Sequence, residues 1–308
     1  MKTSGKGWAK FKQFIPLYLM MIPGASYLII NNYIPMTGIV IAFKKYNVND
    51  GIYGSPWAGL ENFEFLLGSR DAFIIIRNTL LYNVAFIVVN MVVAIMLAIF
   101  ITDVVNQKMR KIYQSSILFP YLISIVVVSY IVFALLSHEN GMINKSIIPL
   151  FGGEPVLWYN ETKYWPLILI ITNCWKGVGY STLIYIAGIA GIDPSYYEAA
   201  ELDGASKWQQ IWNITLPCLK PAIITLLIMH IGRIFYSDFG LFYQIPQDSG
   251  SLYPVTNTID TYVYRALMAA GGIGRSSAAG CFQSVLGFFL VMISNLITRK
   301  ISPDNAIF

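Results

Sequence analysis

Polar side chains interrupt the apolar stretches of this chain at regular intervals. Two groups recur with the spacing of one helix face: Asn173, Lys176, Gly177 and Tyr180, and then His230, Arg233, Tyr236 and Ser237. Amide, ammonium, imidazole and guanidinium groups can hydrogen-bond a polar solute or bind an ion, and they are costly to place in an apolar environment. Both groups are therefore candidates for a pathway through the protein.

Further candidates are Trp175, Tyr185, Asp238 and Tyr243, which lie close to these groups in the sequence, and Asn83 and Asn90, which lie in an earlier apolar stretch. The two asparagines are two helical turns apart and share one face. Each candidate has a structural alternative. His230 and Arg233 can pair with Asp238 or with a partner subunit, and packing or an interfacial belt is the favoured interpretation for any single aromatic residue. Packing of small residues explains Gly188 and Gly191 better than a site does.

The stretches that hold these residues are long enough to cross a membrane. Hydrophobic residues make up 56% of the 308 residues and charged residues 12%, against roughly 25% charged residues in soluble domains. Six apolar stretches cover residues 14–43, 79–101, 112–136, 164–190, 216–240 and 278–298. Most exceed the ~20 residues that a helix needs to span the hydrocarbon layer, and none alternates like a membrane β-strand. The sequence therefore predicts an all-α membrane protein with six transmembrane helices.

The first stretch contains three prolines, and we expect its span to cover residues 14–34, with 35–43 continuing toward the far interface. It is too long for a cleaved signal peptide and lacks a cleavage site, so we expect it to remain as an anchor. The remaining spans are expected at 79–101, 112–136, 164–190, 216–240 and 278–298, within a transmembrane domain that covers residues 14–298.

Basic residues predict the orientation of this domain. With six spans, residues 1–13 and 299–308 lie on the same side of the membrane. The segments on this side carry ten Lys and Arg residues, against eight in opposite loops of nearly twice the length. Both tails are therefore expected in the cytoplasm, although Lys44 and Lys45 fall on the opposite side.

Composition also narrows the classes of ligand. The net charge of +5 is explained by basic residues that set the orientation of the spans in the membrane, so it does not indicate a nucleic-acid partner. The three cysteines, Cys174, Cys218 and Cys281, are isolated from one another and from histidine, which predicts neither a metal site nor a disulfide framework. No GxxxxGK[ST] motif is present, so the chain is not expected to bind ATP through a phosphate loop.

The segment 191–215 is the long polar interruption between the fourth and fifth apolar stretches. Asp193-Pro194 is typical of a helix start, and Gly204 is expected to divide the segment 193–213 into two short helices. Its charges prevent burial in lipid, yet its aromatic residues are too apolar for a merely solvated loop. Because it carries four acidic residues against one lysine, a groove of another protein is favoured over anionic lipid. A surface helix without a partner is the alternative.

The same segment, EAAELDGASKWQQIWNITLP, resembles the EAA motif of ABC importer permeases. Its matching residues are Glu198, Ala199, Ala200, Gly204, Ile214, Leu216 and Pro217. The stretches YIPMTGIVIAFKKYN, SPWAGLENFEFLL, RIFYSDFGLFYQIP and ISPDNAIF also resemble the oligosaccharide and polysaccharide branch of the binding-protein-dependent sugar permeases. The resemblance covers most of the chain.

This resemblance implies a type I ABC importer permease fold and a division of labour among subunits. The EAA segment would be a coupling helix that sits in a cleft of a cytoplasmic ATPase, which binds ATP and Mg²⁺ and hydrolyses ATP. The chain itself is then not an enzyme. A second, different permease and two ATPase subunits complete the transporter, which lies in a bacterial cell membrane. An extracellular or periplasmic substrate-binding protein delivers an oligosaccharide to the outer loops.

A sugar pathway needs the chemistry of the polar stripes described above. Sugar hydroxyls require hydrogen-bonding side chains, and the apolar faces of sugar rings lie on aromatic residues. Two other functions remain as alternatives. An ion-coupled secondary transporter would use Lys176, Arg233 and Asp238, but no inverted repeat is apparent. An intramembrane enzyme is disfavoured because no catalytic HExxH or GxSxG motif lies within a span.

Overall fold

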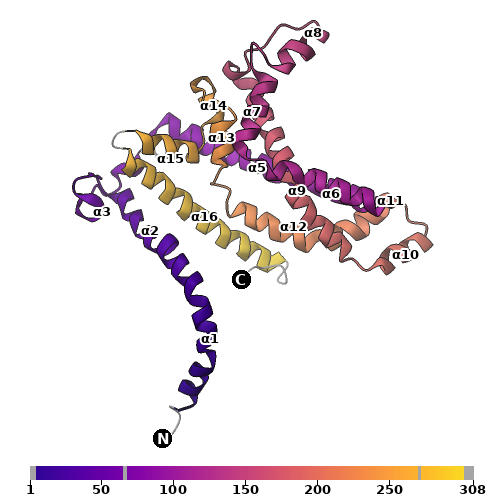
Figure 1. Cartoon of the computed structure of the whole chain (residues 1–308), viewed down its shortest axis with the longest axis horizontal. Coiled ribbons are helices and arrows are strands. Elements are labelled where there is room, and N and C mark those ends of the chain that lie inside the picture. The colour runs from indigo at the N-terminus through magenta and orange to yellow at the C-terminus, as the bar shows by residue number, and fades with distance from the viewer. Residues whose placement is uncertain (1–4, 65–67, 270–271, 302–308) are drawn as a thin grey trace. The chain divides into compact units, whose positions relative to one another are not determined.

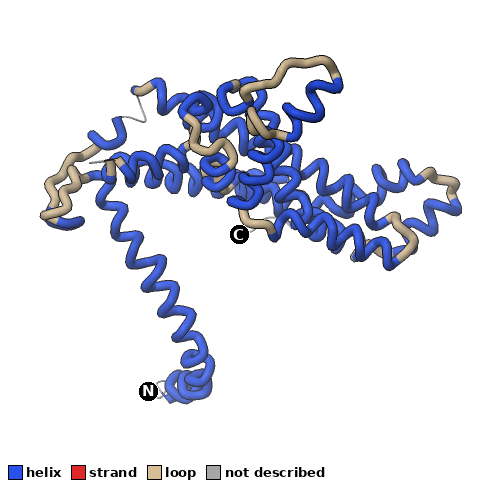
Figure 2. The backbone as a smooth tube through the Cα atoms, turned by 45° about the horizontal axis from the view of Figure 1, so that its top comes forward, coloured by secondary structure: helices blue, strands red, loops and turns tan. Residues whose placement is uncertain are grey.

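The computed structural model describes residues 5–64, 68–269 and 272–301, with side chains described from residue 14 onward. The chain divides into two compact units. One consists of Met1–Phe65 and Ala266–Cys281, and the other of Leu66–Arg265 and Phe282–Phe308. The described residues form helices and connecting loops, without a β-strand (Figure 2). The expectation of an all-α protein is confirmed.

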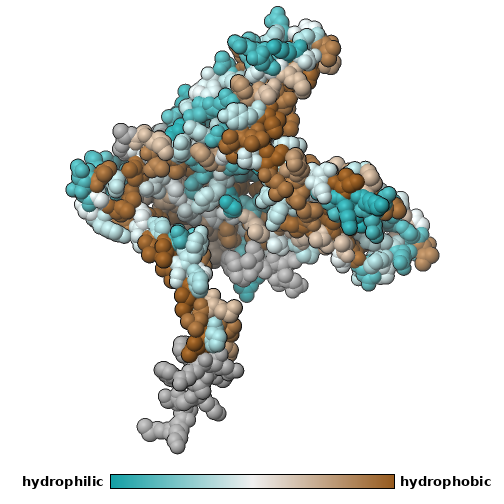
Figure 3. All heavy atoms as spheres, viewed as in Figure 1, coloured by the Kyte–Doolittle hydropathy of each residue, from teal (hydrophilic) through white to brown (hydrophobic). Residues whose placement is uncertain are grey.

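The first unit begins with a long, curved helical segment. It consists of α1 (Gly5–Leu28), a π-helical turn (Ile29–Tyr33), α2 (Ile34–Met36) and a 3-10 helix (Thr37–Phe43). Pro35 lies in the first turn of α2, where a missing amide proton is tolerated. The span Phe14–Phe43 is therefore longer than the expected 14–34, and α1 already begins within the expected tail 1–13. The most apolar window of this span has no buried residue, and hydrophobic side chains cover much of the described part of the span (Figure 3).

A compact turn follows this segment and explains the position of Lys44. The Lys44 side chain is buried, donates to the carbonyl of Tyr53 and lies 5.2 Å from the centre of the Trp57 ring. Asn62 donates to the carbonyls of Ala42 and Lys44 at 3.0 and 2.9 Å. The short helix α3 (Gly51–Gly54) and a 3-10 turn (Glu61–Phe63) complete the turn. Lys44 departs from the expected charge distribution because its ammonium group has a structural role.

The second unit contains the long helices α5 (Arg70–Thr102), α6 (Gln107–Leu122), α7 (Ile125–Leu136), α9 (Trp165–Ala190) and α12 (Leu216–Ile231) (Figure 1). Shorter helices are α8 (Ile148–Leu150), α13 (Phe239–Gln244) and α14 (Tyr253–Thr256). Single turns lie at Ile143–Ile147, Trp158–Asn160, Thr162–Tyr164 and Gly250–Leu252. Two helices, α15 (Ile259–Met268) and α16 (Ile273–Ile301), begin in one unit and end in the other. Helix α9 packs along both α5 and α6.

Five helices are long and apolar enough to cross a membrane, and a bent pair raises the number to six, which supports the expected count. The expected third span, 112–136, differs from the structure because α6 and α7 meet at 94°. Helix α6 ends after Pro120, and the Ser124 hydroxyl accepts from the Val127 amide to start α7. A polar cap between two apolar helices therefore interrupts this span.

Two further boundaries differ from the sequence expectation. The helix of the fifth span starts at Lys207, before the expected residue 216, and α12 ends at Ile231, before the expected residue 240. The last helix, α16, extends beyond the expected 278–298 at both ends. Most of the expected C-terminal tail 299–308, including nearly all of ISPDNAIF, lies outside the described residues.

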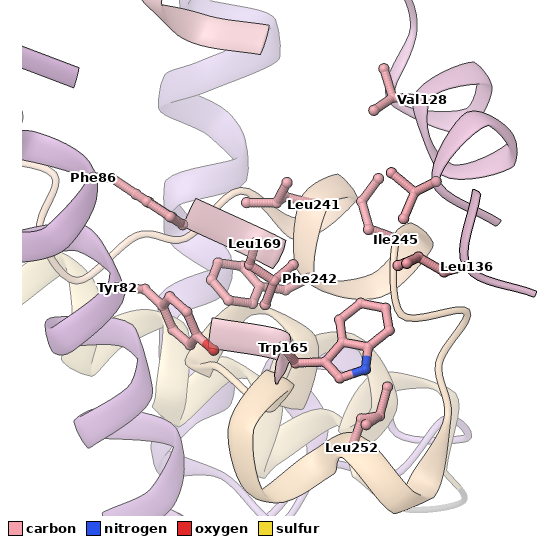
Figure 4. Close-up of a cluster of buried hydrophobic side chains, with 11 residues drawn as sticks. Tyr82, Phe86, Val128, Leu136, Trp165, Leu169, Leu241, Phe242, Ile245 and Leu252 are labelled. Atoms are coloured by element: carbon pink, nitrogen blue, oxygen red, sulfur yellow. The ribbon is translucent and has the colours of Figure 1, made fainter. Parts of the chain in front are cut away.

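Two hydrophobic clusters hold the second unit together. In the first, Phe242 of α13 lies between Tyr82 of α5 and Trp165 of α9, with ring centres of Tyr82 and Phe242 4.8 Å apart (Figure 4). The second is built around Tyr185 and Leu219. Gly188 faces this cluster, because an added Cβ would lie 2.7 Å from the Leu219 side chain. This supports the interpretation of Gly188 as a packing residue.

Candidate functional site

The EAA segment forms two short helices between the end of α9 and the start of α12 (Figure 1). Helix α10 covers Pro194–Leu202, and Asp193 caps it by accepting from the Ser195 amide at 2.9 Å. Hydrogen bonds from Ser195 hold the pKa of Asp193 below its ordinary value. Gly204 has φ of 77°, which favours glycine, so the expected break between the two helices is present.

The second short helix is the beginning of the fifth span. Helix α11 (Lys207–Gln210) starts with a capping box made by Ser206 and Gln209. It continues through a π-helical turn (Ile211–Thr215) into α12, so the expected end of the coupling segment at residue 213 is not a helix boundary. Pro217 lies in the first turn of α12.

The segment is anchored on one side and exposed on the other. Tyr197 and Thr215 are joined by a hydrogen bond of 2.9 Å between their hydroxyl groups, and the Gln210 side chain is buried. Glu198 and Ala199 are exposed, and hydrophilic side chains cover much of this end of the second unit (Figure 3). An exposed helix held firmly from behind can transmit force from a protein that binds it.

A cavity of about 480 Å³ lies between α5, α9 and the end of α12. It brings together nine of the residues that the sequence analysis proposed: Asn83, Asn90, Asn173, Tyr185, His230, Arg233, Tyr236, Ser237 and Asp238. Residues from three separate stretches of sequence therefore share one space. The cavity can accept a polar solute because amide, hydroxyl and charged groups line it.

The charged groups of this cavity are not paired with one another. Among the described residues, no ion pair joins Arg233 to Asp238, so the internal pair that was the structural alternative for Arg233 is absent. Asp238 instead caps α13, accepting from the Leu241 amide at 3.1 Å. The Arg233 guanidinium is consequently available to a ligand with an anionic group.

Two asparagines add hydrogen-bonding capacity to the same wall. Asn90 donates through Nδ2 to Oδ1 of Asn173 at 2.9 Å, which links α5 to α9. The Oδ1 atom of Asn90 is buried and has no hydrogen-bond partner within the protein. A buried acceptor without a partner is costly, and a hydroxyl group entering the cavity would satisfy it.

The chain leaves regular helix geometry between α12 and α13, where it forms part of the cavity wall. Asn83 donates to the carbonyls of Ile234 and Tyr236 at 2.9 and 3.0 Å, and Gln283 donates to the Phe235 carbonyl at 2.8 Å. Irregular backbone at membrane depth persists only where other groups satisfy it. The polar side chain of Asn83 thus has a structural role as well as a place on the cavity wall.

Four proposed pathway residues lie outside the cavity lining: Trp175, Lys176, Tyr180 and Tyr243. Lys176 donates to the carbonyls of Tyr121 and Ile123 at 3.1 and 2.7 Å, at the end of α6. Tyr180 stacks on Tyr121, with ring centres 5.4 Å apart. In the structure Lys176 and Tyr180 therefore contact α6, whereas Asn173 lines the cavity, and a pathway role for these residues stays a prediction. Lys176 and Tyr180 face α6 because α9 packs against both α5 and α6.

The other two residues have different surroundings. Tyr243 stacks on Phe239 within α13 and contacts the Tyr264 ring. Trp175 is exposed, with 43% of its surface accessible. The surroundings of these two residues cannot be predicted from sequence spacing, because they depend on which element packs against each helix face.

Replacing Lys176 with methionine tests its structural role. We expect a loss of about 2 kcal/mol in stability, because two carbonyls at the end of α6 lose a charged donor. Lys176→Arg should recover part of the loss. The measurement is thermal unfolding in detergent, with Lys108→Met on the exposed start of α6 as the control. An unchanged melting temperature together with loss of transport would instead favour an ion-coupling role.

Sequence spacing missed one polar residue of the cavity. Ser181 lines the space together with Asn173 and Tyr185. Ser181 lies eight residues after Asn173 and four residues before Tyr185, so a search of α9 at multiples of four residues finds it. The apolar lining residues Phe86, Ile87, Met91, Leu226 and Leu227 carry no such signal, because they do not differ from lipid-facing residues in the sequence.

Comparison with known proteins identifies the family. The family described as "Binding-protein-dependent transport system inner membrane component" matches residues 93–303. This chain belongs to that family. The chain is thus a membrane-spanning transport permease subunit. The family consists of transporter components and is not a family of enzymes.

Two relatives of this permease come from Bacillus subtilis (strain 168). The polygalacturonan/rhamnogalacturonan transport system permease protein YteP is 36% identical, covering 94% of this chain and 89% of the relative. The arabinooligosaccharides transport system permease protein AraP is 26% identical, covering 80% of this chain and 76% of the relative. The similarity extends over most of each protein.

A solved structure matches the permease over nearly its whole length. It is a bacterial ABC transporter involved in the import of the acidic polysaccharide alginate, with a TM-score of 0.87, 32% sequence identity, and 96% of this chain and 99% of that chain covered. A second match, with a TM-score of 0.87, is the alginate transporter in complex with an alginate pentasaccharide-bound periplasmic protein. The permease therefore has the fold of an ABC importer permease.

Proposed function

We propose that this permease forms half of the membrane pathway of an ATP-driven importer for oligosaccharides or polysaccharide fragments. The observation that carries the proposal is the single cavity that joins polar residues of α5, α9 and the end of α12. A second, different permease would supply the other half. Two ATPase subunits would bind ATP and Mg²⁺, since no phosphate loop is present in this chain.

The chemistry of the cavity favours an acidic oligosaccharide. Arg233 has no carboxylate partner among the described residues, and His230 lies one turn before it. A guanidinium binds a carboxylate with two parallel hydrogen bonds, which a neutral sugar cannot offer. YteP and the alginate transporter are named for acidic polysaccharides, which supports this assignment.

Coupling to the ATPase would occur through the EAA segment. We assign Glu198, Ala199, Ala200 and Gly204 to contact with the ATPase, and Ile214, Leu216 and Pro217 to the connection with α12. Glu198 and Ala199 are exposed, while the Tyr197–Thr215 hydrogen bond ties α10 to the fifth span. Movement of the segment is thereby passed to α12, whose far end forms the cavity wall. We propose that both termini and the EAA segment lie in the cytoplasm, and that the loop 241–277 faces a substrate-binding protein on the opposite side.

The proposal is tested by reconstituting the permease pair with its ATPase and binding protein in liposomes. We expect uptake of an acidic oligosaccharide to require ATP and to be unaffected by ionophores. Uptake that continues without ATP and stops when ion gradients are dissipated would favour the alternative, an ion-coupled secondary transporter.

The substitution Gly204→Val tests the coupling role within this system. Valine is strained at φ of 77°, so the turn between α10 and α11 should change and uptake should fall at least tenfold. Gly59→Val is the control, because Gly59 also has a positive φ, of 58°, but lies in the first unit. Co-purification of the ATPase should weaken for Gly204→Val alone. Equal loss in both variants would point to a general folding defect.

A further inference from the structure

Asp260 holds the cavity wall without lining the cavity itself. Its Oδ2 atom accepts from the Ser237 amide at 2.6 Å, from the Ser237 hydroxyl at 2.7 Å and from Nε2 of Gln283 at 3.2 Å. Asp260 is absent from the residues around the cavity, whereas Ser237 is among them. One carboxylate oxygen therefore gathers three donors immediately behind the wall.

The contact with Gln283 extends this control to the neighbouring backbone. Gln283 is 3% exposed, and its Nε2 atom also donates to the Phe235 carbonyl at 2.8 Å. Asp260 thus orients the side-chain amide of Gln283, which binds the Phe235 carbonyl, and Asp260 itself binds Ser237 two residues later. Three cavity residues, Tyr236, Ser237 and Asp238, follow Phe235 in the sequence. Their positions depend on this arrangement, because the chain there has no regular helix to fix them.

The charge of Asp260 has no basic partner in the described part of the chain. The nearby Arg265 pairs with Asp248, at 2.6 Å between Nη2 and Oδ1. An ionised carboxyl group is an acceptor only, so it can accept these hydrogen bonds without presenting a donor of its own. A role in orientation explains why an acidic residue occupies this position.

We propose that Asp260 is a positioning residue of the transport site, which fixes Ser237 and the adjacent wall for substrate. This inference rests on the proposed function, because it assumes that the cavity receives the transported solute. Asp260 also connects α15, which lies between α13 and α16 in the sequence, to the wall of the cavity. Groups that lock the residues of a site in place are expected to affect the affinity for substrate more than they affect the amount of folded protein.

The first experiment compares Asp260→Ala and Asp260→Asn in the reconstituted transporter. Asparagine retains an acceptor oxygen, so we expect it to keep the KM for the oligosaccharide within about threefold of wild type. Alanine removes all three contacts, and we expect KM to rise about tenfold while the maximal rate changes less than threefold. Glu154→Ala is the control, because Glu154 is an exposed acid in a different loop.

A second experiment measures the wall itself and does not require transport. In a variant without Cys174, Cys218 and Cys281, a cysteine is introduced by Asp238→Cys and labelled with a water-soluble maleimide. We expect Asp260→Ala to change the labelling rate at least fivefold, and Asp260→Asn to change it less than twofold. This result would hold even if the wild type failed to import oligosaccharides, which would count against the proposed function alone.

Several outcomes would overturn the positioning role. Wild-type KM and labelling in Asp260→Ala would show that the wall does not depend on this carboxylate. Equal defects in Asp260→Asn and Asp260→Ala would show that a hydrogen-bond acceptor at this position is not sufficient and that the negative charge is needed. A matching loss of folded protein in both variants would indicate a structural residue only.

Discussion

Gly179→Ala is expected to destabilise this permease strongly, although alanine is ordinarily the better helix former. The reason is the closeness of α9 and α6. A Cβ atom at residue 179 would lie 2.0 Å from the carbonyl oxygen of Ile117 and 3.2 Å from Cα of Leu118. These are backbone atoms, so a side-chain rotation cannot relieve the contact, and the two helices must separate.

Overpacking of this kind costs about 3 kcal/mol, at the upper end of the usual range. Separation of the helices would also affect the Tyr121–Tyr180 stack and the contacts of Lys176, which lie on the same side of α9. We therefore expect little Gly179→Ala protein to survive extraction in detergent, and a lower melting temperature for the fraction that does.

Gly177→Ala is a closely matched control. Gly177 lies two residues earlier on the same helix, and an added Cβ there would meet no atom within 4 Å. Its replacement should be neutral or stabilising by up to about 1 kcal/mol, since glycine is a poor helix former. Effects of opposite sign at the two positions would support the packing of α9 on α6. Equal effects would contradict it.

Arg233→Gln is expected to reduce import of an acidic oligosaccharide by at least tenfold in kcat/KM. Glutamine can still donate and accept hydrogen bonds but carries no charge, so one charge-assisted interaction with a carboxylate is lost. Such interactions contribute about 1.5–3 kcal/mol, and 1.4 kcal/mol corresponds to a factor of ten. Arg233 forms no ion pair among the described residues, so its removal leaves no protein carboxylate without a partner.

The comparison that decides this prediction uses two substrates and a second variant. Import of a neutral oligosaccharide of the same length should change less than threefold in Arg233→Gln. Arg233→Lys should retain part of the acidic-substrate import, because its charge remains while the bidentate geometry is lost. Equal losses for both substrates would mean that Arg233 supports the cavity but does not select for acidic groups.

Several features of the molecule could be predicted from local patterns alone. The apolar stretches gave the class of protein and the approximate number of spans, because a helix in lipid needs a continuous apolar surface. Gly204 predicted the break after α10, and Asp193 predicted its start, since caps and left-handed turns depend on residues adjacent in the sequence. Nine of the proposed pathway residues also line one cavity.

Other features depended on neighbours that are distant in the sequence. Lys176 has the spacing of a pathway residue, but it binds the end of α6, because the 94° break between α6 and α7 brings carbonyls to it. The apolar run continues past Ile231, yet α12 ends there. Asn83, Asp260 and Gln283 then provide the hydrogen bonds that a helix would have supplied.

Membrane location and the EAA segment could thus be inferred from the chain of residues, whereas the interior of the bundle could not. Hydropathy and capping act over a few consecutive residues, so their consequences are readable in a linear pattern. A polar side chain within a span can instead face a cavity, another helix or a broken backbone. That choice is made by whichever helix packs against it, as the separate positions of Asn173 and Lys176 on the same helix illustrate.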